Sequence, residues 1–173
     1  MKDIVDIIGN TPLIKLKYPS EITGCNIYGK AEFMNPAGSI KDRTALGIIL
    51  DAEEKNLIEP GGTVVEGTFG NTGIALTMIN NARGYKTIIV MPDGASEEKQ
   101  SILRNMGAEL KVVATKPYSD PGNYQRVSKR LVEELQSKGE TSVMWANQFD
   151  NTANYKFHSK TTAKEIFNQL DGK

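Results

Sequence analysis

An α/β fold with a doubly wound parallel sheet is predicted by two features of the sequence. Short β-branched or apolar runs alternate with segments of helical periodicity through most of the 173 residues. Turns that contain glycine or proline separate these segments. Repeated β-α units make consecutive strands parallel, and their right-handed crossovers place helices on both faces of the sheet.

The first part of the chain is predicted to hold two short strands. Residues 4–8 are apolar and stop at a Gly-Asn turn. A strand is predicted over 13–16, and a loop over 18–24, which contains Pro, Ser and Gly. A second strand over 26–33 then leads to the loop at 35–39.

The loop at 35–39 opens a helix that is predicted to run to about Glu54. Ser39 is a good N-cap, and Asp42 three residues later completes a capping-box pattern. Lys41 then falls in the first turn, where the helix dipole disfavours an ammonium. Since a neutral lysine is a nucleophile towards carbonyl groups, Lys41 is a candidate catalytic residue. The alternative is a surface lysine in a charged turn.

A glycine-rich loop between a strand and a helix is the second candidate site. The strand is predicted over 63–66 and the helix over 74–82. Backbone N–H groups at such a helix start can bind phosphate or carboxylate, and Thr68, Asn71 and Thr72 would add polar side chains. The spacing matches neither the dinucleotide-binding nor the Walker pattern, which argues against a nucleotide. A capped connector without a ligand is the alternative.

The alternation continues to the end of the chain. Further strands are predicted over 87–91, 110–114 and 141–146. Further helices are predicted from Ser96 to before Gly107, from about 123 to before Gly139, and over 152–170; the middle one has one apolar face made by Tyr124, Val127, Leu131 and Leu135. Asn147 and Gln148 follow the last strand, at the sheet edge where α/β proteins bind ligands, with ordinary turn chemistry as the alternative.

Composition and charge exclude several classes of function. Lys+Arg and Asp+Glu both number 21, so there is no bulk electrostatic case for nucleic acid or an anionic membrane. His158 is the only histidine and Cys25 the only cysteine, which argues against a multi-histidine metal site and an internal disulfide. Cys25 is expected to be buried as a small apolar residue. No apolar run reaches the ~18 residues that span a bilayer, and no signal peptide is evident, so a cytoplasmic location is expected.

Several short motifs follow one another in an order that is typical of one enzyme family. They are Gly9-Asn10-Thr11-Pro12-Leu13, Lys30-x-Glu32, Asn35-Pro36-x-Gly38-Ser39-x-Lys41-Asp42-Arg43, Glu66-Gly67-Thr68-Phe69-Gly70-Asn71-Thr72-Gly73, Met91-Pro92, Gly107-Ala108-Glu109 and Asn147-Gln148-Phe149-Asp150-Asn151. Together they resemble the cysteine synthase and cystathionine β-synthase group of the fold type II pyridoxal-phosphate enzymes, which share the tryptophan synthase β-like fold. The resemblance covers nearly the whole chain.

The resemblance implies pyridoxal 5'-phosphate as cofactor and assigns roles to matching residues. Lys41 matches the lysine that binds the cofactor covalently and then moves protons at Cα and Cβ of the substrate. Asn71 matches the residue that hydrogen-bonds the ring oxygen of the cofactor. The positions that match the family's substrate-binding groups are Thr68, Gly70, Thr72 and Gln148. Phe69 stands in the same loop, where many cysteine synthases carry a serine; no metal is implied.

The reaction implied by the resemblance is a β-replacement. O-acetyl-L-serine would lose acetate, and sulfide would add to give L-cysteine. Cystathionine β-synthase-like condensation and serine/threonine dehydratase-like elimination are the alternatives within the family. An alternative of another class is a non-catalytic remnant or a peptide-binding module. The partners implied are a second copy in a homodimer and the tail of a serine acetyltransferase.

The resemblance also implies a domain division. Residues 1–37 would belong to the larger domain, 38–146 would form the smaller α/β domain, and 147–173 would return to the larger one. The sequence stops before the family's phosphate-binding loop, so we expect a truncated larger domain and weak cofactor binding by these residues alone.

Overall fold

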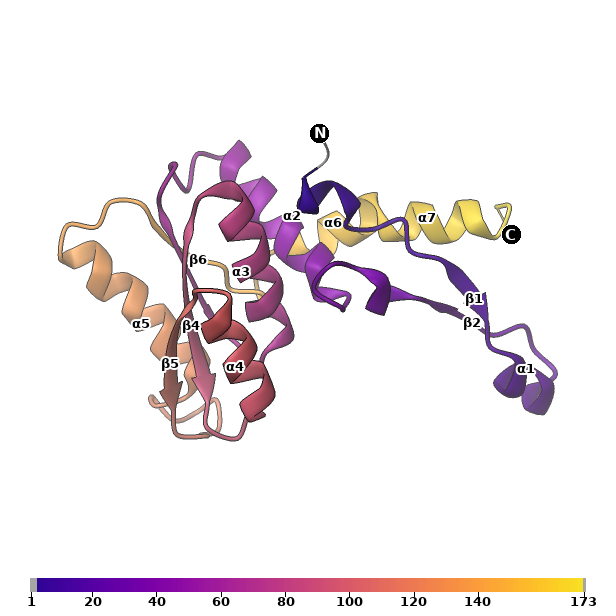
Figure 1. Cartoon of the computed structure of the whole chain (residues 1–173), viewed down its shortest axis with the longest axis horizontal. Helices are drawn as coiled ribbons and strands as arrows, with labels where there is room; N and C mark the ends of the chain where they lie inside the picture. The colour runs from indigo at the N-terminus through magenta and orange to yellow at the C-terminus, as the bar shows by residue number, and fades with distance from the viewer. Residues whose placement is uncertain (1–2, 173) are drawn as a thin grey trace.

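A four-stranded parallel sheet with helices on both faces forms the main body of the computed structural model, which describes residues 3–172 (Figure 1). The strand order is β5-β4-β3-β6. The strands are β3 (Thr63–Gly67), β4 (Lys86–Pro92), β5 (Glu109–Val113) and β6 (Val143–Trp145). All three pairings are parallel, so the predicted sheet is confirmed.

The two faces of β3 show which helices cover the sheet, because neighbouring side chains of a strand point to opposite faces. Val64 packs with α2 (Lys41–Glu54) and α3 (Asn71–Arg83) in one buried cluster. Val65 packs under α5 (Tyr124–Ser137) on the other face. By the same alternation, Glu66 lies on the face that α2 and α3 cover.

Two predicted helices are confirmed closely. The hydroxyl of Ser96 caps α4 (Glu97–Asn105) by accepting a hydrogen bond from the backbone N–H of Lys99. The expected apolar face of α5 packs on the sheet, and it consists of Tyr124, Val127, Leu131 and Leu135.

The start of α2 differs from the prediction by one residue. Ile40, rather than Ser39, occupies the N-cap position, with helical φ and ψ and no side-chain cap. The Ser39 hydroxyl accepts instead from the backbone N–H of Lys41 at 3.1 Å, and the Asp42 carboxylate accepts from the N–H of Ala37 at 2.6 Å. Lys41 is therefore the first residue of the helix, and the predicted end at Glu54 is correct.

The helix α3 begins at Asn71, three residues earlier than predicted. Gly70 precedes it with a φ of 145°, a conformation that is open mainly to glycine. Asn71 and Thr72 therefore belong to the first turn of α3 and not to the loop.

The single helix predicted over 152–170 is wrong, because the structure has two helices there. They are α6 (Ala153–Lys160) and α7 (Thr162–Gln169). Thr161 lies between them with a ψ of −72°, and its hydroxyl donates to the carbonyl oxygen of Phe157 at 2.8 Å. A threonine that bonds back in this way competes with the helical hydrogen bonds and bends the chain.

The loop predicted over 18–24 is also wrong, since α1 (Lys17–Thr23) occupies it. The Ser20 hydroxyl donates to the Leu16 carbonyl oxygen at 2.6 Å, and Gly24 ends the helix in the left-handed conformation. Cys25, which follows, is exposed and not buried as expected.

The 3-10 helix η1 (Ile4–Ile7) packs on α3, and its Val5 belongs to the buried cluster of α2 and α3. An arm beside the main sheet is formed by the antiparallel pair of β1 (Leu13–Lys15) and β2 (Tyr28–Lys30) and by the 3-10 helix η2 (Glu32–Met34). The strands β1 and β2 extend away from the parallel sheet together with α1, and α7 runs along the same side (Figure 1). Among residues 3–172, no helix combines the length and apolar character that crossing a bilayer requires.

Candidate active site

The loop between β3 and α3 is held in shape by Thr68 and Gly70. The buried Thr68 hydroxyl accepts a hydrogen bond from the Gly70 N–H at 3.1 Å. A Cβ atom at Gly70 would collide with the side chain of Lys99. The N-cap position of α3 makes no side-chain hydrogen bond. The start of α3 is therefore suited to binding an anion through its backbone N–H groups.

Thr72 and Gln148 are in direct contact although 76 residues separate them. The Thr72 hydroxyl donates to Gln148 Oε1 at 2.5 Å, and Gln148 Nε2 donates to Glu66 Oε1 at 3.1 Å. All three side chains are buried. The structure thus joins two predicted substrate-binding residues and adds Glu66, whose role the sequence analysis missed. A charged residue at the end of an otherwise apolar strand was the signal available for it.

Among the described residues, no charged side chain pairs with the carboxyl group of Glu66. Only 1% of its surface is exposed. Burial raises the pKa of Glu66 to about 8, against the opposing effect of hydrogen bonds from the Gln148 side chain and from the backbone of Gln148 and Asn147. Within residues 3–172, its Oε2 atom has no hydrogen-bond partner. Glu66 therefore gains or loses its proton near neutral pH.

The two amide residues in the loop after β6, Asn147 and Gln148, have different roles. Asn147 makes the turn, with a φ of 49°, while Gln148 points into the buried site. Asn154, at the start of α6, holds this loop in place. Its Nδ2 donates to the Gln148 carbonyl oxygen at 2.9 Å, and its Oδ1 accepts from the hydroxyl of Thr44 in α2 at 3.0 Å. Asn154 is a second supporting residue that the sequence analysis did not find.

Lys41 and Asn71 occupy the first positions of two helices that pack against each other, α2 and α3. Lys41 is half-buried, and in the described part of the chain its hydrogen bonds are made by the backbone, which leaves the amine without a partner. Asn71 is exposed. No hydrogen bond in residues 3–172 joins either side chain to the Thr72–Gln148 pair.

A buried ion-pair network fixes α2 behind the site. Arg43, which is 1% exposed, bonds through Nε to Glu32 Oε2 and through Nη1 to Glu165 Oε1, both at 2.7 Å. Lys30 Nζ lies 2.7 Å from the other oxygen of Glu165. Burial raises the pKa of Glu165, but the hydrogen bonds from Arg43 and Lys30 outweigh it and bring the pKa down to about 2.

Phe69 turns toward α5. Its ring packs edge-to-face on Tyr124 with centroids 5.2 Å apart and an interplanar angle of 84°. The side chain stays 46% exposed. Phe69 therefore lies on the outer side of the loop that carries Thr68 and Gly70, at its border with α5.

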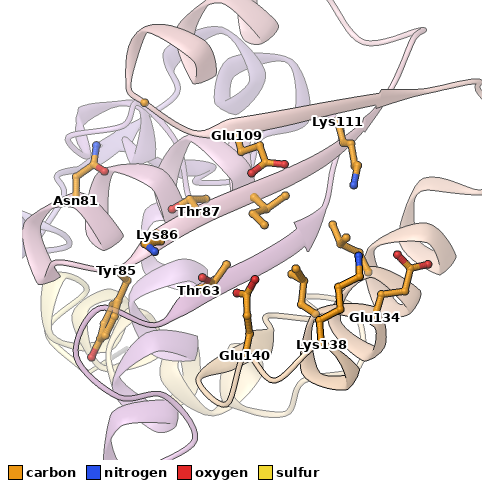
Figure 2. Close-up of a pocket in the computed structure, with 14 residues that line it drawn as sticks. Thr63, Asn81, Tyr85, Lys86, Thr87, Glu109, Lys111, Glu134, Lys138 and Glu140 are labelled. Carbon is orange, nitrogen blue, oxygen red and sulfur yellow. The ribbon is translucent and has the colours of Figure 1, made fainter.

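A cavity of about 600 Å³ lies at the other edge of the sheet (Figure 2). Its lining includes Thr63, Lys86 and Glu109, which are the first residues of β3, β4 and β5. α/β proteins bind ligands at the carboxyl ends of their parallel strands. The candidate residues gather at those ends, so this cavity is not part of the site.

The combination of a partnerless amine at one helix start and an uncapped helix start next to it suits a carbonyl cofactor and an amino-acid carboxylate. This arrangement agrees with the resemblance of the motifs to the fold type II pyridoxal-phosphate enzymes. The family model described as "Pyridoxal-phosphate dependent enzyme" matches residues 4–173. The chain belongs to that family, which confirms the resemblance seen in the motifs and the cofactor class.

Curated relatives and solved structures show which members of the family this chain resembles. Cysteine synthase 1 of Neurospora crassa is 50% identical over 99% of this chain and 44% of its own length. Cysteine synthase B of Escherichia coli is 40% identical over 100% of this chain and 54% of its own. The crystal structure of an O-ureido-L-serine synthase matches with a TM-score of 0.87 and 40% identity, over 100% of this chain and 52% of the other. The chain spans about half the length of these relatives.

Proposed function

We propose that this chain supplies the lysine and the substrate-carboxylate site of a cysteine synthase-like enzyme, which forms L-cysteine from O-acetyl-L-serine and sulfide. The observation that carries the proposal is the hydrogen bond between Thr72 and Gln148. It assembles a polar, buried site from two distant segments at the carboxyl edge of the sheet. The cysteine synthase relatives at 40–50% identity support the same activity.

Each side chain has a defined task in this proposal. Bound pyridoxal 5'-phosphate supplies an aldehyde carbon and an electron-withdrawing ring. The Lys41 amine holds that carbon and moves protons at Cα and Cβ of the amino acid. Asn71 donates to the ring oxygen. The groups that bind the α-carboxylate are Thr68, Gly70, Thr72 and Gln148, which lie at the start of α3 or contact it.

The proposed domain division follows the sheet. The parallel strands β3–β6 and the helices α2–α5 all lie within residues 38–146. The arm elements and α6–α7 lie outside that range. We propose residues 1–37 and 147–173 as parts of the larger domain, a cytoplasmic location, a homodimer, and a serine acetyltransferase tail as a partner.

The first test is covalent labelling of Lys41. The chain is mixed with pyridoxal 5'-phosphate, visible absorbance is recorded, and the product is reduced with borohydride and mapped by mass spectrometry. With the cofactor in excess, to offset the weak binding expected of these residues alone, we expect stoichiometric label on Lys41 and no label at that position in Lys41→Ala, because the Lys41 amine has no competing partner in the described structure. Lys156→Ala, at an exposed lysine of α6, is the matched control and should label as the unmodified chain does.

Scattered label over surface lysines would contradict the proposal for this chain. If Lys41 is labelled, O-acetyl-L-serine is added with sulfide, with homocysteine, or alone. Cysteine formation with sulfide supports the proposed reaction. Cystathionine formation or pyruvate release would assign the chain to one of the two other reactions of the family.

A further inference from the structure

Thr72, Gln148 and Glu66 form a hydrogen-bond chain, and its donor-to-acceptor direction does not suit a carboxylate ligand at Thr72. The hydrogen of the Thr72 hydroxyl points to Gln148 Oε1, so this hydroxyl offers only lone pairs to its surroundings. A carboxylate ligand also offers only lone pairs, and it needs hydrogen-bond donors. In this arrangement the Thr72 hydroxyl cannot donate to the substrate.

If the side-chain amide of Gln148 turns by half a rotation, its oxygen and nitrogen exchange places, and the direction of the hydrogen-bond chain is reversed. Nε2 would then donate to the Thr72 oxygen, and the hydroxyl hydrogen would be free for a carboxylate. Oε1 would move to Glu66, which now accepts from Nε2 at 3.1 Å. An ionised Glu66 only accepts hydrogen bonds and would repel Oε1, whereas a protonated Glu66 donates to it. The reversed arrangement therefore requires a proton on Glu66.

We propose that Glu66 is a positioning residue that sets the direction of this hydrogen-bond chain, so that a substrate carboxylate binds at Thr72 together with a proton on Glu66. The proton comes from solvent, no covalent bond of the substrate changes, and the buried site gains no net charge. This inference rests on the proposed carboxylate site and adds a proton-linked step to it.

The surroundings of Glu66 support the proposal, because they leave Gln148 as its controlling partner. Ile89 of β4 lies beside Glu66 in the sheet, and α5 covers the opposite face. The loop after β6 contributes the amides of Asn147 and Gln148. On the same face, the titratable side chains of α2, α3 and α6, among them Lys41, Arg43 and His158, do not contribute to the pKa of Glu66.

The pKa of Glu66 also lies in a range in which a proton can be gained or lost near neutral pH. Burial raises the pKa of its carboxyl to about 8, so both forms are populated at neutral to mildly basic pH. The buried Oε2 atom has no hydrogen-bond partner among the described residues. The group can therefore exchange its proton without breaking another interaction of that oxygen.

The test measures carboxylate binding and proton uptake together. Propionate is the probe, because it carries no group that titrates above pH 6. Binding to the isotope-labelled chain is followed by NMR from pH 6 to 9 at the Thr72 and Gln148 resonances. Calorimetry in two buffers of different ionisation enthalpy gives the number of protons taken up. We expect weaker binding as pH rises above the pKa of Glu66, with uptake approaching one proton at pH 9 and none at pH 6.

The decisive variant is Glu66→Gln, whose neutral amide both donates and accepts. We expect its affinity for propionate to be independent of pH, close to that of the unmodified chain at pH 6, and its proton uptake to be zero. Glu133→Gln, at an exposed position of α5, is the matched control and should keep the pH dependence.

The possible failures are distinguishable. Propionate that binds at Thr72 and Gln148 with equal affinity at all pH values in the unmodified chain overturns the role of Glu66 and leaves the carboxylate site standing. This measurement does not depend on the folding of the variant. Propionate that moves neither resonance at any pH overturns both the carboxylate site and the inference built on it.

Discussion

A buried glutamate, Glu66, and a half-buried one, Glu165, have pKa values displaced in opposite directions, and their neighbours explain the difference. Glu66 is buried without a cation, so burial raises its pKa to about 8. Burial acts on Glu165 in the same direction, but hydrogen bonds from Arg43 and Lys30 lower its pKa to about 2. Glu165 therefore stays charged and structural, while Glu66 can change charge near neutral pH.

Replacing Glu66 by glutamine should stabilise the protein increasingly as pH rises from 4.5 to about 8. Glu66 has a raised pKa, so the folded state binds its proton more tightly than the unfolded state, where the pKa is 4.5. The stability that depends on this proton is full below pH 4.5 and is lost as pH rises to about 8. Relative to the original chain, Glu66→Gln should gain at most roughly 1.4 kcal/mol per pH unit in that range.

Urea unfolding at several pH values between 5 and 8 measures this gain. The exposed substitution Glu133→Gln controls for loss of charge. A difference between Glu66→Gln and the original chain that is the same at every pH would show that the pKa of Glu66 is not raised in the folded protein.

Gly70→Ala should disturb the start of α3. The φ of 145° is strained for alanine, and the added Cβ meets the Lys99 side chain. We expect a loss of about 1–3 kcal/mol in the free energy of unfolding and weaker carboxylate binding. Gly61→Ala is the control, since it shares a positive φ of 81° but has open space around its Cβ. If Lys99→Ala added to Gly70→Ala restores nothing, the collision is not part of the effect.

At the scale of elements, the sequence predicts which helices and strands exist better than where they begin. The sheet strands and α4 follow from apolar runs and a local Ser96 cap. The start of α2 depends on Asp42 reaching back to Ala37, and the start of α3 depends on a glycine conformation packed against Lys99. These are contacts of the folded loops, so a periodic pattern does not contain them.

A side-chain hydrogen bond to the backbone is present at both places where the assignment of secondary structure was wrong. Ser20 and Thr161 both donate to carbonyl oxygens four residues earlier, at Leu16 and Phe157. The first accompanies a helix in a segment with loop composition, and the second accompanies a break in a segment with helical composition. The same type of bond has opposite outcomes, and the surrounding packing decides between them.

Arg43 connects three elements, so its removal should destabilise the protein strongly. It bonds Glu32 in η2 and Glu165 in α7 from its position in α2. Arg43→Ala leaves the half-buried Glu32 without a cation and Glu165 with Lys30 alone, and we expect a loss of about 3–5 kcal/mol in the free energy of unfolding. Arg83→Ala breaks a more exposed ion pair with Glu53 and should lose less than about 1 kcal/mol.

Chemical denaturation of the two variants at neutral pH measures both losses. Equal losses would show that the buried network contributes no more than a surface pair. The pH dependence has a definite sign: the stability from Glu165 is present above pH 4.5 and is lost as pH falls toward 2, because its pKa is lowered in the folded state.

At the scale of the whole molecule, the candidate site was predictable in its parts and not in its connections. The carboxyl edge of the sheet and the family motifs point to Thr72 and Gln148. The supporting residues Glu66 and Asn154 were missed, because Glu66 bonds Gln148 and Asn154 bonds Thr44 only after distant segments have come together. Sequence spacing carries no trace of a contact that the strand order creates.

The strand order has a consequence for how the protein folds. β3 pairs with β4, which follows it closely, and also with β6, which comes much later. Distant strands pair slowly, because the entropy of closing the long loop between them is lost before their contacts form. We therefore expect β6 to dock last, on a sheet that β3, β4 and β5 have already formed. Gln148 follows β6, so its bond to Thr72 can form only after β6 has paired with β3. We therefore expect the buried polar site to be completed in the final step of folding.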